Sequence, residues 1–237
     1  AVVDIPVGPD GKPAGEPQAE VRQVVAGAGA VSYAPVDSLI AVAAARVSAR
    51  VNRRIATIGA SLEREGSQYA LGNLVADAQR WAGKGDIAVM NNAGIRSRLP
   101  AGTITYGRLF VIQPFDNTLY RVSMTGAQVR QYVEKLVGGD GIGVHVSGIT
   151  VGYDPTKPKG QRVVSLRLPA GRTLSDDAIY SVVMNNFIAT GGSNLGPPDG
   201  SHIVRTGVSD LDALIRYLGR QRSPITVPTE NRIFITQ

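Results

Sequence analysis

Two adjacent segments, an amphipathic helix and a short apolar strand, constrain the fold more than any other part of the sequence. Residues 71–82 place apolar side chains at helical spacing and therefore predict a helix with one buried face. Residues 86–90 form a short apolar run of the kind that makes a buried strand, and this run ends at the polar loop 91–94. Together the two segments predict a packed globular core in this part of the chain.

Further helices and strands are interspersed along the rest of the chain. The predicted helices span residues 39–54, 106–112, 127–136 and 210–221, and the predicted strands span 118–124, 149–153, 162–168, 178–185 and 232–235. Because many of these strands follow hairpin-like turns, the sequence favours an α+β fold, a mixed β-sheet domain flanked by helices. A length of 237 residues suits one main domain with an appendage.

The first 54 residues differ in character from the remainder of the chain. Residues 1–37 predict a short strand and a loop rich in proline and glycine, which cannot bury a core alone. The helix at 39–54 is expected to begin at an N-cap formed by Asp37 and Ser38 and to bury an apolar stripe of Leu39, Val42, Ala43, Val47 and Val51. Its arginines, at 46, 50, 53 and 54, form a basic face. Because no aromatic residue interleaves with them, we expect a solvated face or a domain contact rather than a nucleic-acid surface.

Composition excludes several classes of function. The chain has no cysteine, which rules out disulfides, thiolate metal sites and cysteine nucleophiles, and its two histidines are too few for a histidine-rich metal centre. The net charge of +6 is scattered, so it favours anionic small molecules or wall and membrane polymers over dedicated nucleic-acid binding. No apolar run is long enough to span a membrane. With neither an initiator methionine nor a signal peptide, the chain is expected to be processed or excised from a longer one.

The residues alone identify no catalytic centre. The sequence contains no Walker loop, no G-x-S-x-G, no H-E-x-x-H, no D-x-D-x-D-G and no dinucleotide-binding glycine pattern. The paired Asp176 and Asp177 are interpreted as turn residues, and Asp77 and Asp86 as caps at element boundaries. Catalysis therefore has no visible candidate in this chain.

Polar and aromatic side chains instead gather in three loops that come after apolar elements. The first holds Asn91, Asn92 and Arg96, the second holds Phe115, and the third is the stretch 186–193 with Phe187. Taken singly, each phenylalanine is expected in the core and Arg96 on the surface. Considered together, the three loops point to one binding site.

These loops belong to a set of motifs that resembles the C-terminal domain of the 5′-nucleotidase family, secreted metallophosphatases that hydrolyse nucleotides. The matching stretches occur in the right order between residues 55 and 235. They are LGNLVADA (71–78), IAVMNNAGIR (87–96), GTITY (102–106), QPFDNT (113–118), VSGI (146–149) and residues 180–192, which end in NFIATGG. Six ordered motifs make a chance match implausible.

The resemblance implies a substrate-binding role for this chain. In the family two phenylalanines enclose the base, and by motif position these are Phe115 and Phe187, while Asn91 and Arg96 contact the base and the ribose or phosphate. A base between two rings gains about 1–3 kcal/mol per stack, largely regardless of its identity. The implied binding set is completed by Asn92, Gly192 and Ser193, with no catalytic and no metal-binding residue.

Two departures from the family pattern bear on ligand preference. The family commonly has aspartate after the paired glycines, where it grips the ribose hydroxyls, but this chain has Ser193. The family also usually has an arginine before the G-N-L motif, and residues 66–70 contain none. The grip on an anion therefore rests on Arg96 alone, or Arg64 reaches the site by another path. We expect weaker or altered ligand preference.

The resemblance also implies what this chain lacks. The family's divalent metal pair and its D-x-H, G-N-H-E and G-H-x-H clusters belong to an N-terminal metallophosphatase domain, and none of these clusters occurs here. Residues 1–37 are thus expected to be the end of that domain and its connector, 38–54 the linker helix, and 55–237 the substrate-binding domain. The chain alone is expected to be inactive and to bind no cofactor of its own. Its partners would be a nucleotide or nucleoside and the metallophosphatase domain, in a periplasmic, extracellular or cell-wall location.

Two alternatives stay open from the sequence. The domain could be a non-catalytic surface or wall binding module with a degenerate pocket, which Ser193 and the missing arginine would favour. It could also come from a 2′,3′-cyclic phosphodiesterase, a UDP-sugar hydrolase or a thiosulfate-handling branch of the same fold.

Overall fold

The computed structural model describes residues 1–23, 32–139 and 141–236. Contacts between residues divide the chain into two compact units, Ala1–Arg46 and Val47–Gln237. The first unit contains a short antiparallel ribbon of β1 (Val2–Asp4) and β2 (Gln18–Glu20), joined by a turn around Gly11, whose φ is +75°. Its strand residues are exposed on both faces, so this unit has no hydrophobic core among its described residues.

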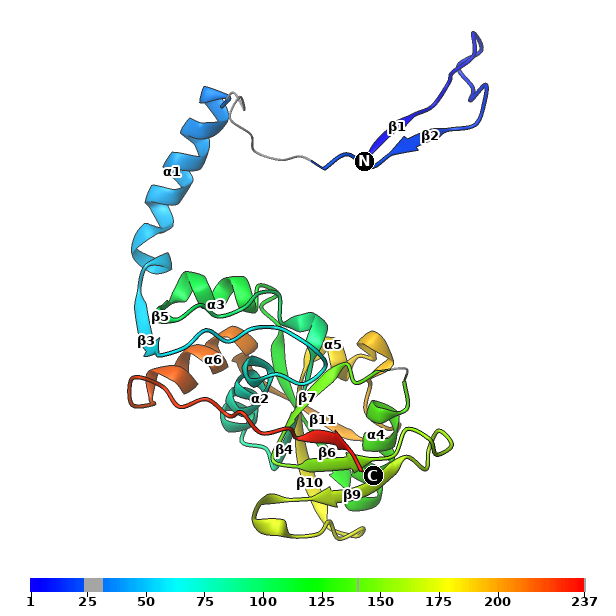
Figure 1. Cartoon of the computed structure of the whole chain (residues 1–237), viewed down its shortest axis with the longest axis vertical. Coiled ribbons are helices and arrows are strands. Elements are labelled where there is room, and N and C mark those ends of the chain that lie inside the picture. Colours follow the sequence, from blue (N-terminus) through cyan, green and yellow to red (C-terminus); the bar gives the residue numbers. More distant parts are fainter. Residues whose placement is uncertain (24–31, 140, 237) are drawn as a thin grey trace. The chain divides into compact units, whose positions relative to one another are not determined.

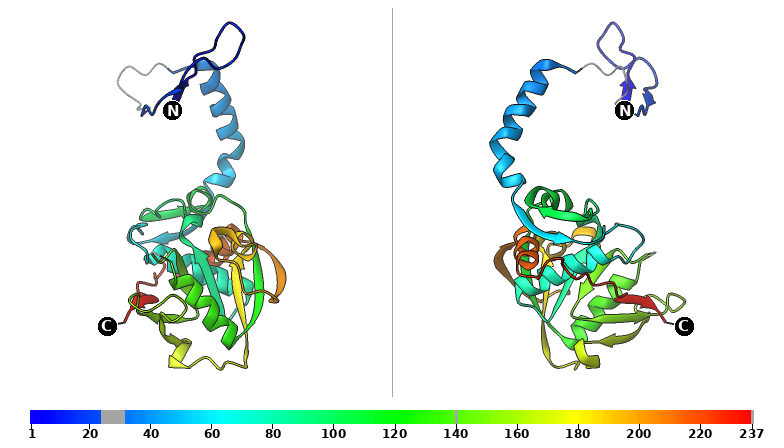
Figure 2. Two further views of the ribbon diagram at one scale, coloured as in Figure 1. Left: turned by 90° about the vertical axis from the view of Figure 1, so that its right-hand side faces the viewer. Right: turned by 60° about the vertical axis from the view of Figure 1, so that its left-hand side comes forward.

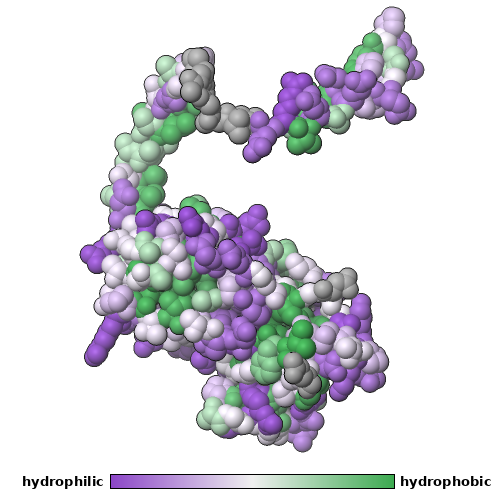
Figure 3. Space-filling view, viewed as in Figure 1, coloured by the Kyte–Doolittle hydropathy of each residue, from purple (hydrophilic) through white to green (hydrophobic). Residues whose placement is uncertain are grey.

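The helix predicted at 39–54 is present as α1, Ala34–Val51, but its bounds and its environment differ from the prediction. Asp37 and Ser38 do not cap it, because they lie inside its first turns. Pro35 in the first turn is the signal that the sequence reading overlooked, since a proline there loses no hydrogen bond. The expected apolar stripe is not buried: Leu39 is 71% exposed and Val42 52%. Figure 3 shows hydrophobic residues on the surface of this helix.

The second unit is organised by a five-stranded mixed sheet with the order β11-β6-β10-β4-β7 (Figure 1). Only β4 and β10 are parallel; the other neighbours are antiparallel. The strands are β4 (Ile87–Asn91), β6 (Thr118–Thr125), β7 (Val144–Ser147), β10 (Ile179–Asn185) and β11 (His202–Ser209). The sequence did not predict β7 and β11. Most of β11 is exposed along an edge of the sheet, so it lacks the apolar pattern that marks a strand.

Smaller elements complete the unit. A three-stranded sheet has the order β12-β8-β9, and β3 pairs with β5. These strands are β3 (Arg54–Ile58), β5 (Gly102–Thr105), β8 (Thr150–Tyr153), β9 (Val163–Arg167) and β12 (Ile233–Ile235). The α-helices are α2 (Ala70–Gly83), α3 (Tyr106–Ile112), α4 (Gly126–Val137), α5 (Asn186–Ala189) and α6 (Asp210–Gly219). Three 3-10 turns, η1 (Asn92–Gly94), η2 (Pro169–Gly171) and η3 (Gly192–Asn194), lie in the loops.

Alternation along the central strands separates two cores. Ile87 and Val89 of β4 belong to one core, with α4 and the three-stranded sheet. Ala88 and Met90 point the other way, toward the face covered by α2 and α6, which lie side by side in Figures 1 and 2. The fold is therefore the predicted α+β domain with a mixed sheet flanked by helices.

Candidate functional site

The three predicted loops meet at one end of the central strands. Strands β4 and β10 are parallel and both end there, and β6 begins there because it runs antiparallel to β10. The chain segments next to these strand ends enclose a cavity of about 380 Å³. This volume falls in the range of about 300–1,000 Å³ that is typical of small-molecule pockets. The cavity is lined by Asn91, Ala93, Gly94, Arg96, Phe115, Asn117 and Phe187.

The two phenylalanines of this cavity are unusually exposed. Phe115 is 54% exposed in the turn between α3 and β6, and Phe187 is 43% exposed on the short helix α5. The ring of Phe187 packs closely on Gly192, where a Cβ atom would lie 2.6 Å from the ring. Any larger residue at 192 would displace that ring. Large apolar side chains left open at a cavity offer surface to a planar apolar ligand.

Arg96 lies over one of these rings. Its guanidinium carbon is 5.9 Å from the centroid of the Phe115 ring, within cation–π range. Its Nη1 donates a hydrogen bond to the carbonyl of Ala93 at 3.2 Å, and its backbone N–H donates to the carbonyl of Ile112 at 2.8 Å. The backbone is thus fixed while most of the planar fork of donors remains available for an oxygen-rich ligand.

A buried asparagine that the sequence reading did not single out orients Asn91. Asn185, at the end of β10, is fully buried and donates from Nδ2 to Oδ1 of Asn91 at 2.9 Å. Its own Oδ1 accepts from the backbone N–H of Ile188 and caps α5, the helix that carries Phe187. This hydrogen bond fixes the amide plane of Asn91, which lines the cavity and keeps Nδ2 as its donor group. One side chain therefore positions both Asn91 and the helix of Phe187.

Asn117 is a second cavity residue to which the sequence reading gave no role. Its Nδ2 donates to Oδ2 of Asp210 at 3.0 Å, and the backbone N–H of Asp210 donates back to the Asn117 carbonyl at 2.8 Å. Burial raises the pKa of Asp210 to about 6, against the lowering effect of the hydrogen bonds from Asn117 and from the Leu211 N–H. The neighbouring Asp116 holds a positive φ of 52°, a costly conformation for this residue that shapes the turn after Phe115.

Three residues of the predicted set do not line this cavity: Gly192, which packs under the ring of Phe187, and Asn92 and Ser193. Asn92 and Ser193 line an adjoining hollow of about 1,150 Å³, which shares Asn91 and Ala93 with the smaller cavity. The Nδ2 of Asn92 donates to the carbonyl of Ser67 at 3.1 Å. The guanidinium of Arg64 lies 3.5 Å from the carbonyl of Asn92, so Arg64 reaches this loop from outside the smaller cavity.

Comparison with known proteins places this arrangement in a family. Residues 42–197 match the family described as "5'-nucleotidase, C-terminal domain". The chain belongs to this family. It is 36% identical over 171 residues to Endonuclease YhcR of Bacillus subtilis, a match that covers 70% of this chain and 14% of YhcR. It is 32% identical over 179 residues to Cell wall protein Lmo0130 of Listeria monocytogenes, covering 68% of this chain and 23% of that protein.

The fold is shared with family members of known structure. The crystal structure of a 5'-nucleotidase precursor from Thermus thermophilus superposes with a TM-score of 0.75 at 30% identity and covers 84% of this chain. The present chain covers 42% of that one. It also spans less than a quarter of the length of YhcR and of Lmo0130. The resemblance inferred from the six motifs is thus confirmed for the C-terminal domain of 5'-nucleotidases.

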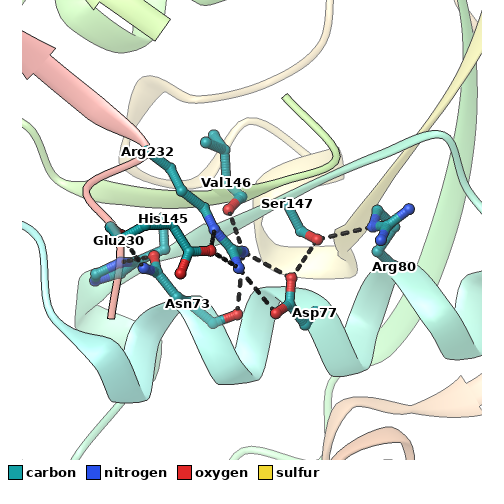
Figure 4. A network of polar contacts seen from close by, with 8 residues as sticks. All are labelled: Asn73, Asp77, Arg80, His145, Val146, Ser147, Glu230 and Arg232. Atoms are coloured by element: carbon teal, nitrogen blue, oxygen red, sulfur yellow. Dashed lines mark hydrogen bonds and ion pairs between the residues drawn. The ribbon is translucent and has the colours of Figure 1, made fainter. Parts of the chain in front are cut away.

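The first of those family motifs serves packing rather than ligand contact. Asp77, expected to be a cap, instead lies in the middle of α2 and binds Arg232 through two hydrogen bonds of 2.6 and 2.9 Å (Figure 4). Arg232 also bonds the Val146 carbonyl and Glu230, and Ser147 donates to Asp77 while it accepts from Arg80. The network joins α2, β7 and the segment before β12. Its members are absent from the lining of the phenylalanine cavity.

His145 extends this network into the core. It is fully buried, its Nδ1 lies 3.3 Å from Oδ1 of Asn73, and its ring meets Tyr69 edge-on. Gly72 is required beside it, because a Cβ there would lie 2.1 Å from the imidazole. Burial, aided by the charge of Arg232, lowers the pKa of His145 to about 4. The imidazole is therefore neutral at pH 7 and has a structural role.

Neither a metal site nor a membrane span is found in the part of the chain that the structure describes. Within residues 1–23, 32–139 and 141–236, no group of three or more histidine, aspartate or glutamate side chains is placed to hold a metal ion. Across those same residues, no helix has the length and apolar character needed to cross a bilayer.

Proposed function

We propose that the cavity between Phe115 and Phe187 binds a nucleotide or nucleoside, with the base stacked between the two rings. The observation that carries this proposal is convergence: side chains from three loops, far apart in sequence, line one cavity of about 380 Å³. Two half-exposed rings suit a planar base, whereas Arg96 and the Nδ2 of Asn91 suit its oxygen and nitrogen acceptors. Such a pocket selects a ligand and supplies no reacting group.

The domain would serve as the specificity part of a phosphoric ester hydrolase of the 5'-nucleotidase type. Family membership supports this role, because solved relatives named 5'-nucleotidase contain the same domain within a longer chain. The described residues contain no cluster that could hold a metal pair, so we assign the metal chemistry to a metallophosphatase domain of the same polypeptide. In this proposal, residues 1–37 are the end of that domain and its connector. Residues 38–54 are the linker helix, and residues 55–237 are the binding domain. This chain alone would then be inactive and would need no cofactor.

A location outside the cytoplasm belongs to the same proposal. A relative of this chain is named a cell wall protein. We therefore place the parent protein in the periplasm, the cell wall or the extracellular space.

Calorimetric titration of the chain with adenosine, AMP and a UDP-sugar tests the proposal. Phe115→Ala and Phe187→Ala should each weaken adenosine binding about 5- to 150-fold, the equivalent of one lost stack of about 1–3 kcal/mol. Phe110→Ala is a matched control, because Phe110 is 46% exposed on α3 but does not line the cavity. Binding that survives both cavity substitutions would refute the stacking arrangement.

A second candidate, a wall-binding module with a degenerate pocket, has one specific observation in its favour. Ser193, which replaces the family's ribose-gripping aspartate, lies in the adjoining hollow and not in the phenylalanine cavity. This candidate predicts no measurable heat with any of the three ligands. A UDP-sugar that binds more tightly than AMP would instead favour a UDP-sugar hydrolase as the parent.

A further inference from the structure

A separate cavity of about 720 Å³ collects positive charge from four distant segments of the chain. It lies between the end of α2, strand β6, the edge strand β11 and α6. The lining includes the cationic side chains of Lys84, Arg121, Arg205 and Arg216. Among the described residues, no aspartate or glutamate lines it, and none forms an ion pair with any of these four. The nearest acidic position along α6 is Asp212, one turn before Arg216.

This cationic cavity shares no lining residue with the phenylalanine cavity. Lys84 precedes β4, whereas Asn91 lies at the far end of that strand, so the two cavities face different parts of the sheet. A ligand of one cavity therefore need not occupy the other.

The rim of the cationic cavity carries Trp81, the single tryptophan of the chain. Its side chain is 39% exposed at the end of α2. The guanidinium of Arg220 lies 4.9 Å from its ring centroid, and the ring of Tyr217 lies 5.9 Å away. Tyr217 is tilted by 50° against Trp81 and does not stack on it, and the exposed part of the indole is a surface on which a base can stack.

The helix of residues 39–54 gave no reason to expect a nucleic-acid surface, because its arginines lack interleaved aromatic residues. The cationic cavity meets that requirement with different residues. Its charges and its tryptophan are spread over residues 81–216, so no local run in the sequence displays them.

We propose that this cavity binds a short segment of single-stranded nucleic acid. Lys84, Arg121 and Arg216 would neutralise successive phosphates, and one base would stack on Trp81. The cavity is larger than a single phosphate requires, and phosphates spaced along a chain match cations spaced across several elements. The exposed ring of Trp81 favours nucleic acid over a polyanion without bases, because only nucleic acid offers a base to stack on it.

Trp81 provides a direct readout, since no other tryptophan contributes to the fluorescence. A single-stranded oligodeoxythymidylate should quench it on titration at low salt. With three phosphates neutralised, affinity should fall roughly 15- to 20-fold between 50 and 200 mM salt, from a slope of about −0.7 per phosphate.

Two exposed positions, Lys84→Gln and Arg216→Gln, test the assignment without disturbing the core. Each should weaken binding several-fold and reduce the salt slope by about 0.7. Arg172→Gln is a matched control, because Arg172 is also exposed but lies far along the chain from every lining residue. Equal loss in the control would overturn the proposal, as would no binding at all.

Two further arms identify the ligand class and the site. Inorganic polyphosphate of matched charge should bind more weakly than the oligonucleotide and leave the fluorescence of Trp81 nearly unchanged; equal affinity would overturn the nucleic-acid assignment. Phe115→Ala combined with Phe187→Ala should keep full oligonucleotide binding, measured by the anisotropy of a labelled strand. Loss of binding in that variant would place the oligonucleotide in the phenylalanine cavity instead and would also overturn the proposal.

Discussion

Two polar regions of the second unit use their side chains in opposite ways. Around Arg232, the guanidinium makes hydrogen bonds to Asp77, Glu230 and the Val146 carbonyl, and only 10% of its side chain is exposed. In the phenylalanine cavity, the two rings are about half exposed and Arg96 makes one side-chain hydrogen bond, to Ala93. A polar group whose partners all lie in the protein stabilises the fold. A polar side chain such as Arg96, which has hydrogen-bond donors without partners among the described residues and lies beside exposed apolar surface, is available to a ligand.

The largest expected effect comes from breaking the satisfied region. Arg232→Met leaves the Asp77 carboxylate buried without its partner, so the free energy of unfolding should fall by about 3–5 kcal/mol. Urea unfolding monitored by circular dichroism measures it. The control is Arg130→Met, which removes an exposed ion pair with Asp176 and should cost less than about 1 kcal/mol. Equal losses in the two variants would show that the buried pair has no special role.

Substitutions in the phenylalanine cavity should affect ligand binding more than stability. Phe115→Ala and Phe187→Ala are expected to change the unfolding free energy by less than about 1 kcal/mol, because exposed substitutions rarely cost more. The same substitutions should weaken adenosine binding by about 1–3 kcal/mol each. Combined urea unfolding and calorimetry on each variant reveals the split. A variant that unfolds easily but binds normally would reassign its phenylalanine to the core.

Asn185 shares features of both regions. It is buried like Arg232, and it also positions two parts of the phenylalanine cavity, the side chain of Asn91 and the helix of Phe187. Asn185→Ala removes the cap of α5 and the hydrogen bond to Asn91, so it should cost about 1–2 kcal/mol of stability and also weaken ligand binding. Asn185→Asp retains the acceptor for the Ile188 N–H but loses the donor to Asn91. Calorimetry should find its affinity still reduced. Wild-type affinity in Asn185→Asp would mean that Asn91 needs no such orientation.

Acid provides the smallest expected difference, because two buried groups oppose each other. Burial lowers the pKa of His145 from 6.5 to about 4, so below pH 6.5 the unfolded chain binds a proton that the folded chain does not, and stability is lost as the pH falls toward 4. Burial raises the pKa of Asp210 from 3.8 to about 6, with Asp116 adding repulsion. Between pH 6 and 4 the folded state therefore binds this proton first, and acidification favours folding through Asp210.

Removing Asp210 should leave the effect of His145 on the pH dependence of stability unopposed. Asp210→Asn is expected to lose stability on acidification faster than the wild type, by at most about 1 kcal/mol per pH unit between pH 6 and 4. Urea unfolding at pH 7, 6, 5 and 4 compares the two proteins. Parallel profiles would contradict the opposing roles of these two groups.

The sequence predicted α2 and the buried strands β4, β6 and β10 because their patterns are local, but it missed β7 and β11. The apolar run before Asn91 became β4, and the amphipathic pattern before it became α2. It failed where partners are distant: Asp77 resembles a helix cap until Arg232, 155 residues away, is placed beside it. The apolar side of α1 resembled a core stripe, yet helical spacing alone does not supply a partner to cover it.

In the candidate site too, residues in local motifs could be predicted from the sequence, whereas residues whose role depends on distant partners could not. Asn91, Arg96, Phe115 and Phe187 stand in recognisable motifs, so the sequence could nominate them, and the structure brings them to one cavity. Asn185 could not be nominated, because its role arises from the parallel pairing of β4 with β10, which brings it beside Asn91. The cationic cavity was equally hidden, since its residues converge from four elements.

A crystal structure of the chain with adenosine tests the central claim most directly. We predict electron density for the base between the rings of Phe115 and Phe187, with Nδ2 of Asn91 within hydrogen-bonding distance of a base or ribose acceptor. Density for adenosine that touches neither ring, at a ligand concentration where calorimetry shows saturation, would contradict the account.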